Sequence, residues 1–163
     1  EQYNIRLLPL YVDMDGRTLH DGVDVKPDDI YAHVAAGSGL PKSAAVNMAD
    51  YVRTFTALSA KNDFVIHVCI SLDFSCCYQN AKLAAADFDN VYVVDSRNLS
   101  TGHGLVVLEA ERMAREGMEP QAIVAALDFV SPPEQHAENL RMYSEEIEYS
   151  DENIKIICDA LKQ

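Results

Sequence analysis

Along the chain, short continuous runs of apolar residues alternate with longer stretches in which apolar residues recur at helical spacing. Residues 64–70 and 91–94 are short apolar runs rich in β-branched side chains, the pattern of strands buried on both faces. Stripes of apolar residues at helical spacing occupy residues 47–60 and 105–115, and Asn47 stands where a helix cap is expected. Strands that alternate with helices in this way favour an α/β fold, with a mostly parallel sheet flanked by helices in a three-layer sandwich.

The beginning of the chain predicts one further strand and a turn. Residues 5–12 are apolar except for Arg6, and Asp13-Met14-Asp15-Gly16 follows them with the signature of a hairpin turn. Residues 40–43 are expected to form a loop. Helices are also predicted near Pro27 and from Pro120, and Ser75 is expected to cap a further helix that extends to about Asp87.

Residues 131–163 are more acidic than residues 1–130. Acidic side chains are frequent in this last part, and Ser131 and Ser150 stand where helix caps are expected. We therefore expect an α/β domain over residues 1–130, followed by an acidic helical tail over residues 131–163.

Composition narrows the class of protein. The chain has 163 residues, 48% of them hydrophobic, and no stretch approaches the roughly 20 apolar residues that a membrane-spanning helix requires. There are 26 acidic and 13 basic residues, and the resulting formal charge of −13 would repel the phosphates of a nucleic acid. A globular domain with neither a nucleic-acid partner nor an integral membrane segment is therefore expected.

The four cysteines indicate a reducing compartment. Cys76 and Cys77 are adjacent and cannot pair comfortably with each other, and four cysteines are too few for a disulfide-stapled secreted scaffold. The first residues also lack the pattern of a signal peptide, which favours a cytoplasmic location. Glu1 suggests that the native start of the protein lies upstream.

Two local motifs suggest catalysis, and each also has a purely structural interpretation. Asp13 and Asp15 form a D-x-D-G motif that resembles the nucleophile motif of haloacid-dehalogenase-like phosphatases, but a downstream lysine and a late acidic pair are not evident. Cys76 and Cys77 at a helix start could supply a thiolate, but the sequence places no histidine beside them. Known zinc and calcium spacings are not matched either. The chain is therefore not expected to be an enzyme or to bind a metal.

Hydroxyl side chains follow successive predicted strands. Ser71 and Ser75 come after the strand over residues 64–70, and Asp95 and Ser100 come after the next one. Ligands of open parallel sheets bind at the carboxyl edge, where the amides at the start of the Ser75 helix could receive a carboxylate or a phosphate. The alternative is that these serines only cap helices.

Several segments, taken in order, carry a resemblance to a known family. They are residues 4–10, Asp21-Gly22-Val23-Asp24, Leu40-Pro41-Lys42-Ser43, Ser75-Cys76-Cys77-Tyr78-Gln79-Asn80-Ala81 and Val94-Asp95-Ser96-Arg97. Together they resemble the DegV family of bacterial fatty-acid-binding proteins. The resemblance extends from Tyr3 to about Val130 and corresponds to the first domain of that family, without its usual first strand and without its second domain.

The resemblance implies binding of a long-chain fatty acid, without a cofactor and without covalent chemistry. In that family a threonine in the loop that matches Ser43, and the serine that matches Ser75, hold the carboxylate of the fatty acid, which is presented to a separate kinase. Ser43 and Ser75 are therefore the expected ligand-binding residues. Further candidates near the same edge are Ser71, Cys76, Cys77 and Ser100.

The chain departs from the family pattern at the expected site and in length. Cys76-Cys77 stands where the family usually has Gly-Thr, and residues 43–47 stand where it usually has Thr-Ser-Gln-Pro-Ser. Because the acyl tunnel of the family lies between two domains, a one-domain chain has an alternative function: a noncatalytic interaction domain that has lost lipid binding and forms a homodimer through its tail.

Overall fold

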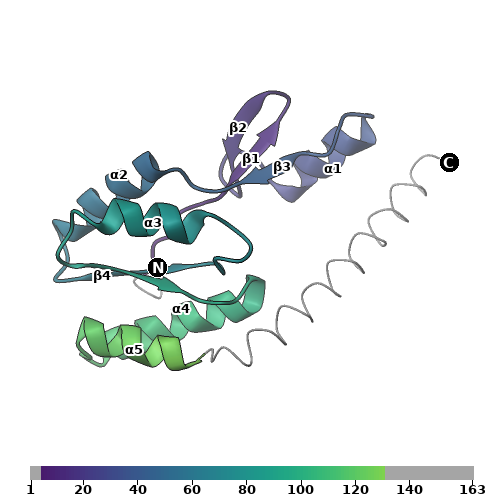
Figure 1. Ribbon diagram of the computed structural model, residues 1–163. Helices are drawn as coiled ribbons and strands as arrows, with labels where there is room; N and C mark the ends of the chain where they lie inside the picture. Colours follow the sequence, from purple (N-terminus) through teal and green to yellow (C-terminus); the bar gives the residue numbers. More distant parts are fainter. Residues whose placement is uncertain (1–4, 131–163) are drawn as a thin grey trace. The chain divides into compact units, whose positions relative to one another are not determined.

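The computed structural model describes residues 5–130, which fall into two compact units (Figure 1). Of these residues, 5–8 and 45–130 form the sheet unit, and 9–44 form the hairpin unit. The predicted tail, residues 131–163, lies outside the described residues, and with it Cys158.

A two-stranded parallel sheet lies at the centre of the sheet unit. Strand β4 (Val65–Cys69) pairs with β5 (Val91–Asp95) in a register that places Val65 opposite Val91 and Cys69 opposite Asp95. Helices cover both faces, as strands that are apolar on both sides require (Figure 1). One face carries α2 (Met48–Ser59) and α3 (Cys77–Ala85), and the other carries α4 (Ser100–Arg115) and α5 (Pro120–Val130).

The two faces of this sheet have separate cores. Between the sheet, α4 and α5, Ile123 is fully buried in a cluster with Val94, Val106, Ala110, Met113 and Leu127. On the other face the Phe55 ring of α2 is buried, and its centre lies 5.5 Å from that of the His67 ring of β4. The apolar stripes expected from the sequence are therefore the surfaces that pack on the sheet.

The hairpin unit is built on an antiparallel sheet. Strands β1 (Tyr11–Met14) and β2 (Arg17–His20) pair antiparallel, and β3 (Lys42–Ala44) pairs antiparallel with β1 on its other side. The turn residues Asp15 and Gly16 have φ of 52° and 71°, as the tight turns that suit a two-residue hairpin require. This confirms the hairpin expected from Asp-Gly. Helix α1 (Pro27–Ala35) completes the unit.

The expectation of a mostly parallel sheet was wrong. Among the described strands, one pair is parallel and two pairs are antiparallel. Within residues 5–130 the parallel sheet has two strands, because the apolar run over residues 5–12 becomes a strand only from Tyr11 and then pairs within the hairpin unit. Residues 40–43 are not entirely a loop, since Lys42 and Ser43 belong to β3.

Asn90 holds the end of α2 against the start of β4. Its Oδ1 accepts a hydrogen bond from Ser59 Oγ at 2.6 Å, and its Nδ2 donates to the carbonyls of Ser59, Asn62 and Asp63 at 3.2–3.3 Å. One side chain thus satisfies several backbone acceptors of the loop that leads into the sheet.

Replacing Asn90 with alanine is expected to lower the free energy of unfolding by about 1.5 kcal/mol, because these carbonyls lose their donor. Urea titration followed by far-ultraviolet circular dichroism measures the change. The neighbouring exposed residue supplies the control, since Asp89→Ala is expected to shift stability by no more than about 0.5 kcal/mol. Equal stability of the two variants would contradict the role assigned to Asn90.

Candidate functional site

Ser75 lies at the N-terminal end of α3, as expected. Its Oγ accepts a hydrogen bond from the Cys77 amide at 3.2 Å and lies 3.1 Å from Cys77 Sγ, to which it donates. The helix itself begins at Cys77, so its N-cap is Cys76, one residue after the expected cap Ser75. A thiol sulfur is a weak acceptor, so the Ser75 hydroxyl hydrogen is readily available to a better one.

Ser71 shapes the loop between β4 and α3. It is fully buried; its amide donates to the Asn98 carbonyl at 2.9 Å, and its Oγ accepts from the Asp73 amide at 3.3 Å. A buried hydroxyl that is engaged within its own loop stabilises the local turn. Ser71 is therefore placed near Ser75 in sequence, but its contacts are those of a structural residue.

Asp95 connects the loops that follow the two parallel strands. Its Oδ1 accepts from the Leu72 amide at 3.2 Å and from the Arg97 amide at 3.0 Å. Strand pairing places Asp95 opposite Cys69, so the loop after β4 and the loop after β5 leave the sheet side by side. Asp95 therefore orients both loops by accepting hydrogen bonds from their amides.

A hydrogen-bonded turn at residues 96–98 was not expected. The Ser96 Oγ, which is buried, accepts from the Asn98 amide at 3.2 Å, and the Asn98 Nδ2 donates to the Ser96 carbonyl at 2.8 Å. The Nδ1 of His103, from the first turn of α4, lies 3.2 Å from Ser96 Oγ. Asparagine two residues after a serine was the available signal, because such side chains bond to nearby backbone in turns.

The cysteines of this region differ sharply in environment. Cys77 is buried, with only 3% of its surface exposed, whereas Cys76 is exposed. Cys69 is also buried, and burial raises the pKa of its thiol to about 12, with further contributions from Cys77 and Asp95. Burial favours the neutral thiol, so Cys69 is not a thiolate nucleophile at neutral pH.

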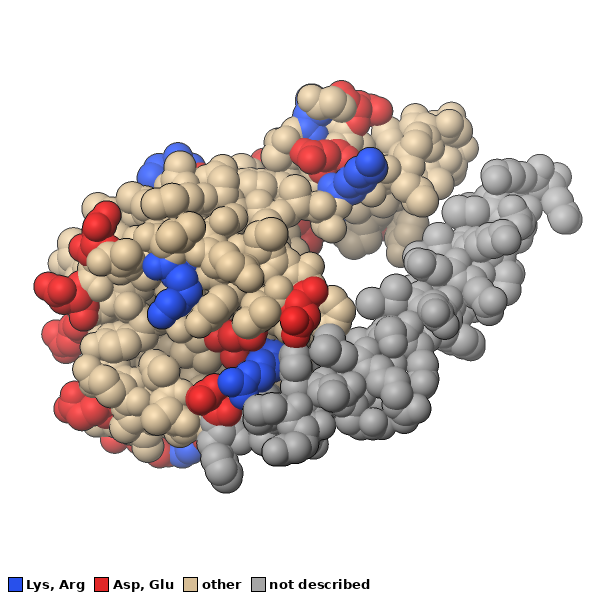
Figure 2. All heavy atoms as spheres, viewed as in Figure 1, with Lys and Arg blue, Asp and Glu red and all other residues tan. Residues whose placement is uncertain are grey.

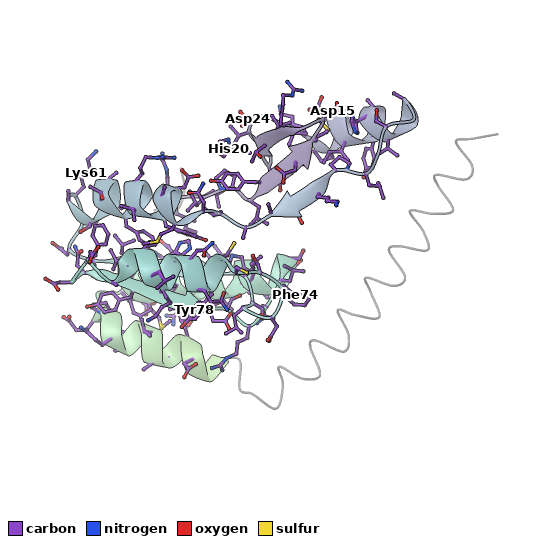
Figure 3. All side chains as sticks on the ribbon, turned by 45° about the horizontal axis from the view of Figure 1, so that its top comes forward. Asp15, His20, Asp24, Lys61, Phe74 and Tyr78 are labelled. Carbon is purple, nitrogen blue, oxygen red and sulfur yellow. The ribbon has the colours of Figure 1, made fainter. Side chains whose placement is uncertain are left out.

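Apolar side chains remain at the surface beside Ser75. Leu72 and Phe74, in the loop before α3, are 41% and 37% exposed. Tyr78 lies on the first turn of α3, and burial together with the Asp95 carboxylate raises the pKa of its phenol. Figure 3 shows Phe74 beyond the N-terminal end of this helix. The Ser75 hydroxyl therefore has both hydrogen-bonding and apolar neighbours.

Two further ligand-binding candidates from the sequence are Ser43 in β3 and Ser100 in α4. Ser43 is exposed in the middle of β3, where it stands opposite Val12 in the hairpin unit, and its convergence with Ser75 stays a prediction. Ser100 is exposed at the start of α4 with φ of 50°. Its role as a ligand-binding residue also stays a prediction.

The aspartates of the D-x-D-G motif have a structural role. Thr18 Oγ1 of β2 donates to Asp13 Oδ1 at 2.6 Å, and Asp15 forms the turn between β1 and β2. A phosphatase nucleophile of the type considered stands at the end of a parallel strand, whereas Asp13 lies in an antiparallel hairpin. The hairpin interpretation therefore accounts for the motif.

The surface of the sheet unit carries few charges on the face that Figure 2 shows. In the view of Figure 2 most of the sheet unit's surface is uncharged, and carboxylates stand around its margin. Within residues 5–130, no helix is long and apolar enough to cross a membrane, and no three histidine, cysteine or acidic side chains are grouped as metal ligands.

Comparison with known sequences identifies the family. The model of the DegV family, described as "uncharacterised protein, DegV family", matches residues 1–140. The chain belongs to the DegV family. A DegV domain-containing protein of Caldanaerobacter subterraneus subsp. tengcongensis is 33% identical over 127 residues, which are 77% of this chain and 45% of that protein.

Solved structures of DegV proteins share the fold. A DegV family protein from Thermus thermophilus, described by its fatty acid binding, is 32% identical with a TM-score of 0.70, covering 76% of this chain and 44% of that one. A Thermotoga maritima protein, whose structure is described as revealing a fatty acid binding function, is 28% identical with a TM-score of 0.67, covering 78% and 48%. The chain thus spans less than half the length of these DegV relatives.

Proposed function

We propose that this chain binds a long-chain fatty acid and holds its carboxylate at the carboxyl edge of the sheet unit, with Ser75 as the principal donor. The observation that carries the proposal is the position of the Ser75 hydroxyl. It lies at the start of α3, and its hydrogen is directed to a thiol sulfur, a weak acceptor. A carboxylate is a far stronger acceptor, so ligand binding would exchange a weak hydrogen bond for a charge-assisted one.

The surroundings of Ser75 support a ligand with a long apolar part. Leu72 and Phe74 expose apolar surface beside the hydroxyl. Burial of each CH₂ group of an acyl chain contributes about 0.8 kcal/mol, so affinity can come from the chain while the hydroxyl fixes the headgroup. The similar structures from Thermus thermophilus and Thermotoga maritima, both above 25% identity, are described as fatty-acid-binding.

The remaining residues take supporting roles in this proposal. Within the sheet unit, the exposed Cys76 and Ser100 are proposed to border the headgroup. Asp95 orients the two loops through their amides. Presentation of the bound acid to a separate kinase belongs to the same proposal.

Replacing Ser75 with alanine is expected to weaken oleate binding about tenfold to a hundredfold, because one charge-assisted hydrogen bond is lost. Displacement of a fluorescent fatty acid from the purified chain measures the change. Ser38→Ala, at an exposed serine of the hairpin unit, is the control and should leave the affinity unchanged.

Two results would count against the proposal. Unchanged oleate affinity in a folded Ser75→Ala variant would remove Ser75 from the site. A parent chain that binds neither oleate nor palmitate, and that native mass spectrometry shows as a dimer, would favour the noncatalytic interaction domain.

A further inference from the structure

Three buried side chains lie behind the Ser75 hydroxyl within the sheet unit. Tyr51 belongs to α2, Cys69 ends β4 and Cys77 begins α3, and each is at most 3% exposed. Helices α2 and α3 cover the same face of the sheet and pack against each other (Figure 1). Three elements that are distant in sequence thus bring one phenol and two thiols together in the core.

The Tyr51 phenol connects the two thiols. It forms side-chain hydrogen bonds with Cys69 and with Cys77. Burial raises the pKa of the phenol, and the two cysteines raise it further, so the hydroxyl keeps its hydrogen at neutral pH. The Tyr51 ring also packs edge to face with the His67 ring, with the ring centres 5.1 Å apart, and this packing fixes the position of the hydroxyl.

Ser75 extends this cluster toward the surface. Its side chain is half-buried, and its Oγ lies 3.1 Å from Cys77 Sγ, to which it donates. A network of three hydrogen bonds therefore runs from the start of α3 into the core, through Ser75, Cys77, Tyr51 and Cys69. Each of the four side chains carries one hydrogen on a rotatable bond and can both donate and accept.

The network has four hydrogens for three hydrogen bonds, so one hydrogen is left over. While Ser75 donates to Cys77, the remaining hydrogen belongs to one of the three buried side chains. The Ser75 hydrogen is free, with all three hydrogen bonds kept, only when every link is reversed. Tyr51 then donates to Cys77, and Cys77 donates to Ser75. This reversal requires only rotation about C–O and C–S bonds, and no proton leaves its atom.

We propose that Tyr51 positions the headgroup-binding hydroxyl: when a carboxylate binds, the network reverses, and Ser75 turns its hydrogen from Cys77 to the ligand. This inference rests on the proposed function and adds Tyr51 and Cys77 to it. In the free protein the Ser75 hydrogen is held by a thiol sulfur. In the bound protein the Ser75 oxygen receives the Cys77 thiol hydrogen and donates its own hydrogen to the carboxylate.

Loss of the Tyr51 hydroxyl would break the network behind Cys77. The Cys77 thiol would lose its inner partner, and its hydrogen would be free to turn to Ser75 whether or not a ligand is bound. Hydrogen bonds in series polarise one another, so a Ser75 hydroxyl supported by both Cys77 and Tyr51 is a stronger donor to a carboxylate than one supported by Cys77 alone. The contribution of Tyr51 is smaller than that of Ser75, which contacts the ligand itself.

Tyr51→Phe tests the proposal because it keeps the ring and removes only the hydroxyl. We expect oleate to bind about threefold to tenfold more weakly, as measured by displacement of a fluorescent fatty acid. In a protein that already carries Ser75→Ala, Tyr51→Phe should have no further effect on oleate affinity, since no hydroxyl is left to position. Tyr92→Phe is the matched control and should leave the affinity unchanged. This phenol of β5 accepts a hydrogen bond from Gln121 of α5 at 2.9 Å, on the opposite face of the sheet.

Cys77 supplies a second arm in which Tyr51 stays intact. Cys77→Ser retains a side chain that donates and accepts, so it should bind oleate within about twofold of the parent protein, whereas Cys77→Ala should lose about as much affinity as Tyr51→Phe. Infrared spectroscopy adds a direct measurement, because the S–H stretching band lies in a region free of other protein absorption. The Cys77 band is identified by its absence in Cys77→Ser. Oleate should shift this band in the parent protein, because the thiol hydrogen moves from Tyr51 to Ser75.

Four results would overturn the proposal. Full oleate affinity in Tyr51→Phe, with Ser75→Ala still impaired, would exclude Tyr51 and leave the proposed function intact. Equal losses from Tyr51→Phe in the parent and in the Ser75→Ala background would show a purely structural role. An unchanged Cys77 band in the oleate-bound protein would exclude reversal of the network. Full affinity in both Ser75→Ala and Tyr51→Phe would refute the proposed function, and this inference with it.

Discussion

The free energy of unfolding is expected to fall by up to about 3 kcal/mol through a single histidine as the pH is lowered from 6.5 to 4. Burial lowers the pKa of His67 to about 4, and the neighbouring His103 contributes in the same direction. The unfolded chain takes up a proton at His67 near pH 6.5, whereas the folded chain resists it until about pH 4. The stabilising contribution is therefore complete above pH 6.5 and is lost as the pH falls toward 4.

Two substitutions separate this effect from the titration of the many carboxylates. His67→Phe and His67→Gln both remove the titrating group, so both should flatten the loss of stability between pH 6.5 and 4 relative to the parent chain. His67 Nε2 is buried and has no hydrogen-bond partner among the described residues. His67→Phe leaves no polar side-chain atom at this position, whereas His67→Gln places an amide there, so His67→Phe should be the more stable of the two at pH 7. Urea titrations at intervals across this pH range measure both differences. A parent-like slope in both variants would show that His67 does not titrate as described.

Truncation of Ile123 is expected to lower the free energy of unfolding by about 3 kcal/mol. This side chain of α5 is fully buried in the cluster formed with β5 and α4, so Ile123→Ala removes apolar contacts and leaves a cavity. Urea titration at pH 7 provides the value. Leu105→Ala, on α4 but 63% exposed, is the control and should cost less than about 1 kcal/mol. A loss of similar size at both positions would argue against the α4–α5 core described above.

The sequence predicts those elements that are stabilised by neighbouring residues in the chain or by burial of their apolar side chains. Asn47 was expected to cap a helix, and its Oδ1 accepts from the Asp50 amide at 2.9 Å at the start of α2. The β-branched runs became β4 and β5 because both of their faces are covered by helices. Asp15 and Gly16 form the expected turn because their left-handed backbone suits it.

The missed features depend on partners distant in sequence. Strand β3 has only three residues and exists because it pairs with β1, about thirty positions earlier in the chain. The site shows the same limit. Sequence placed Ser71 and Ser75 together as hydroxyls, but only the structure shows that Ser71 is buried and bonded within its loop.

The Asp95 carboxylate limits how the loop after β4 and the loop after β5 can change in length. A single carboxylate oxygen receives one amide from each of the two loops beyond the parallel strands, so the loops cannot be repositioned independently. An insertion or deletion in residues 70–76 would withdraw the Leu72 amide and leave the oxygen with its Arg97 partner alone. A change in the length of either loop is therefore expected to cost a hydrogen bond at Asp95, so the two loops are best exchanged together in engineering.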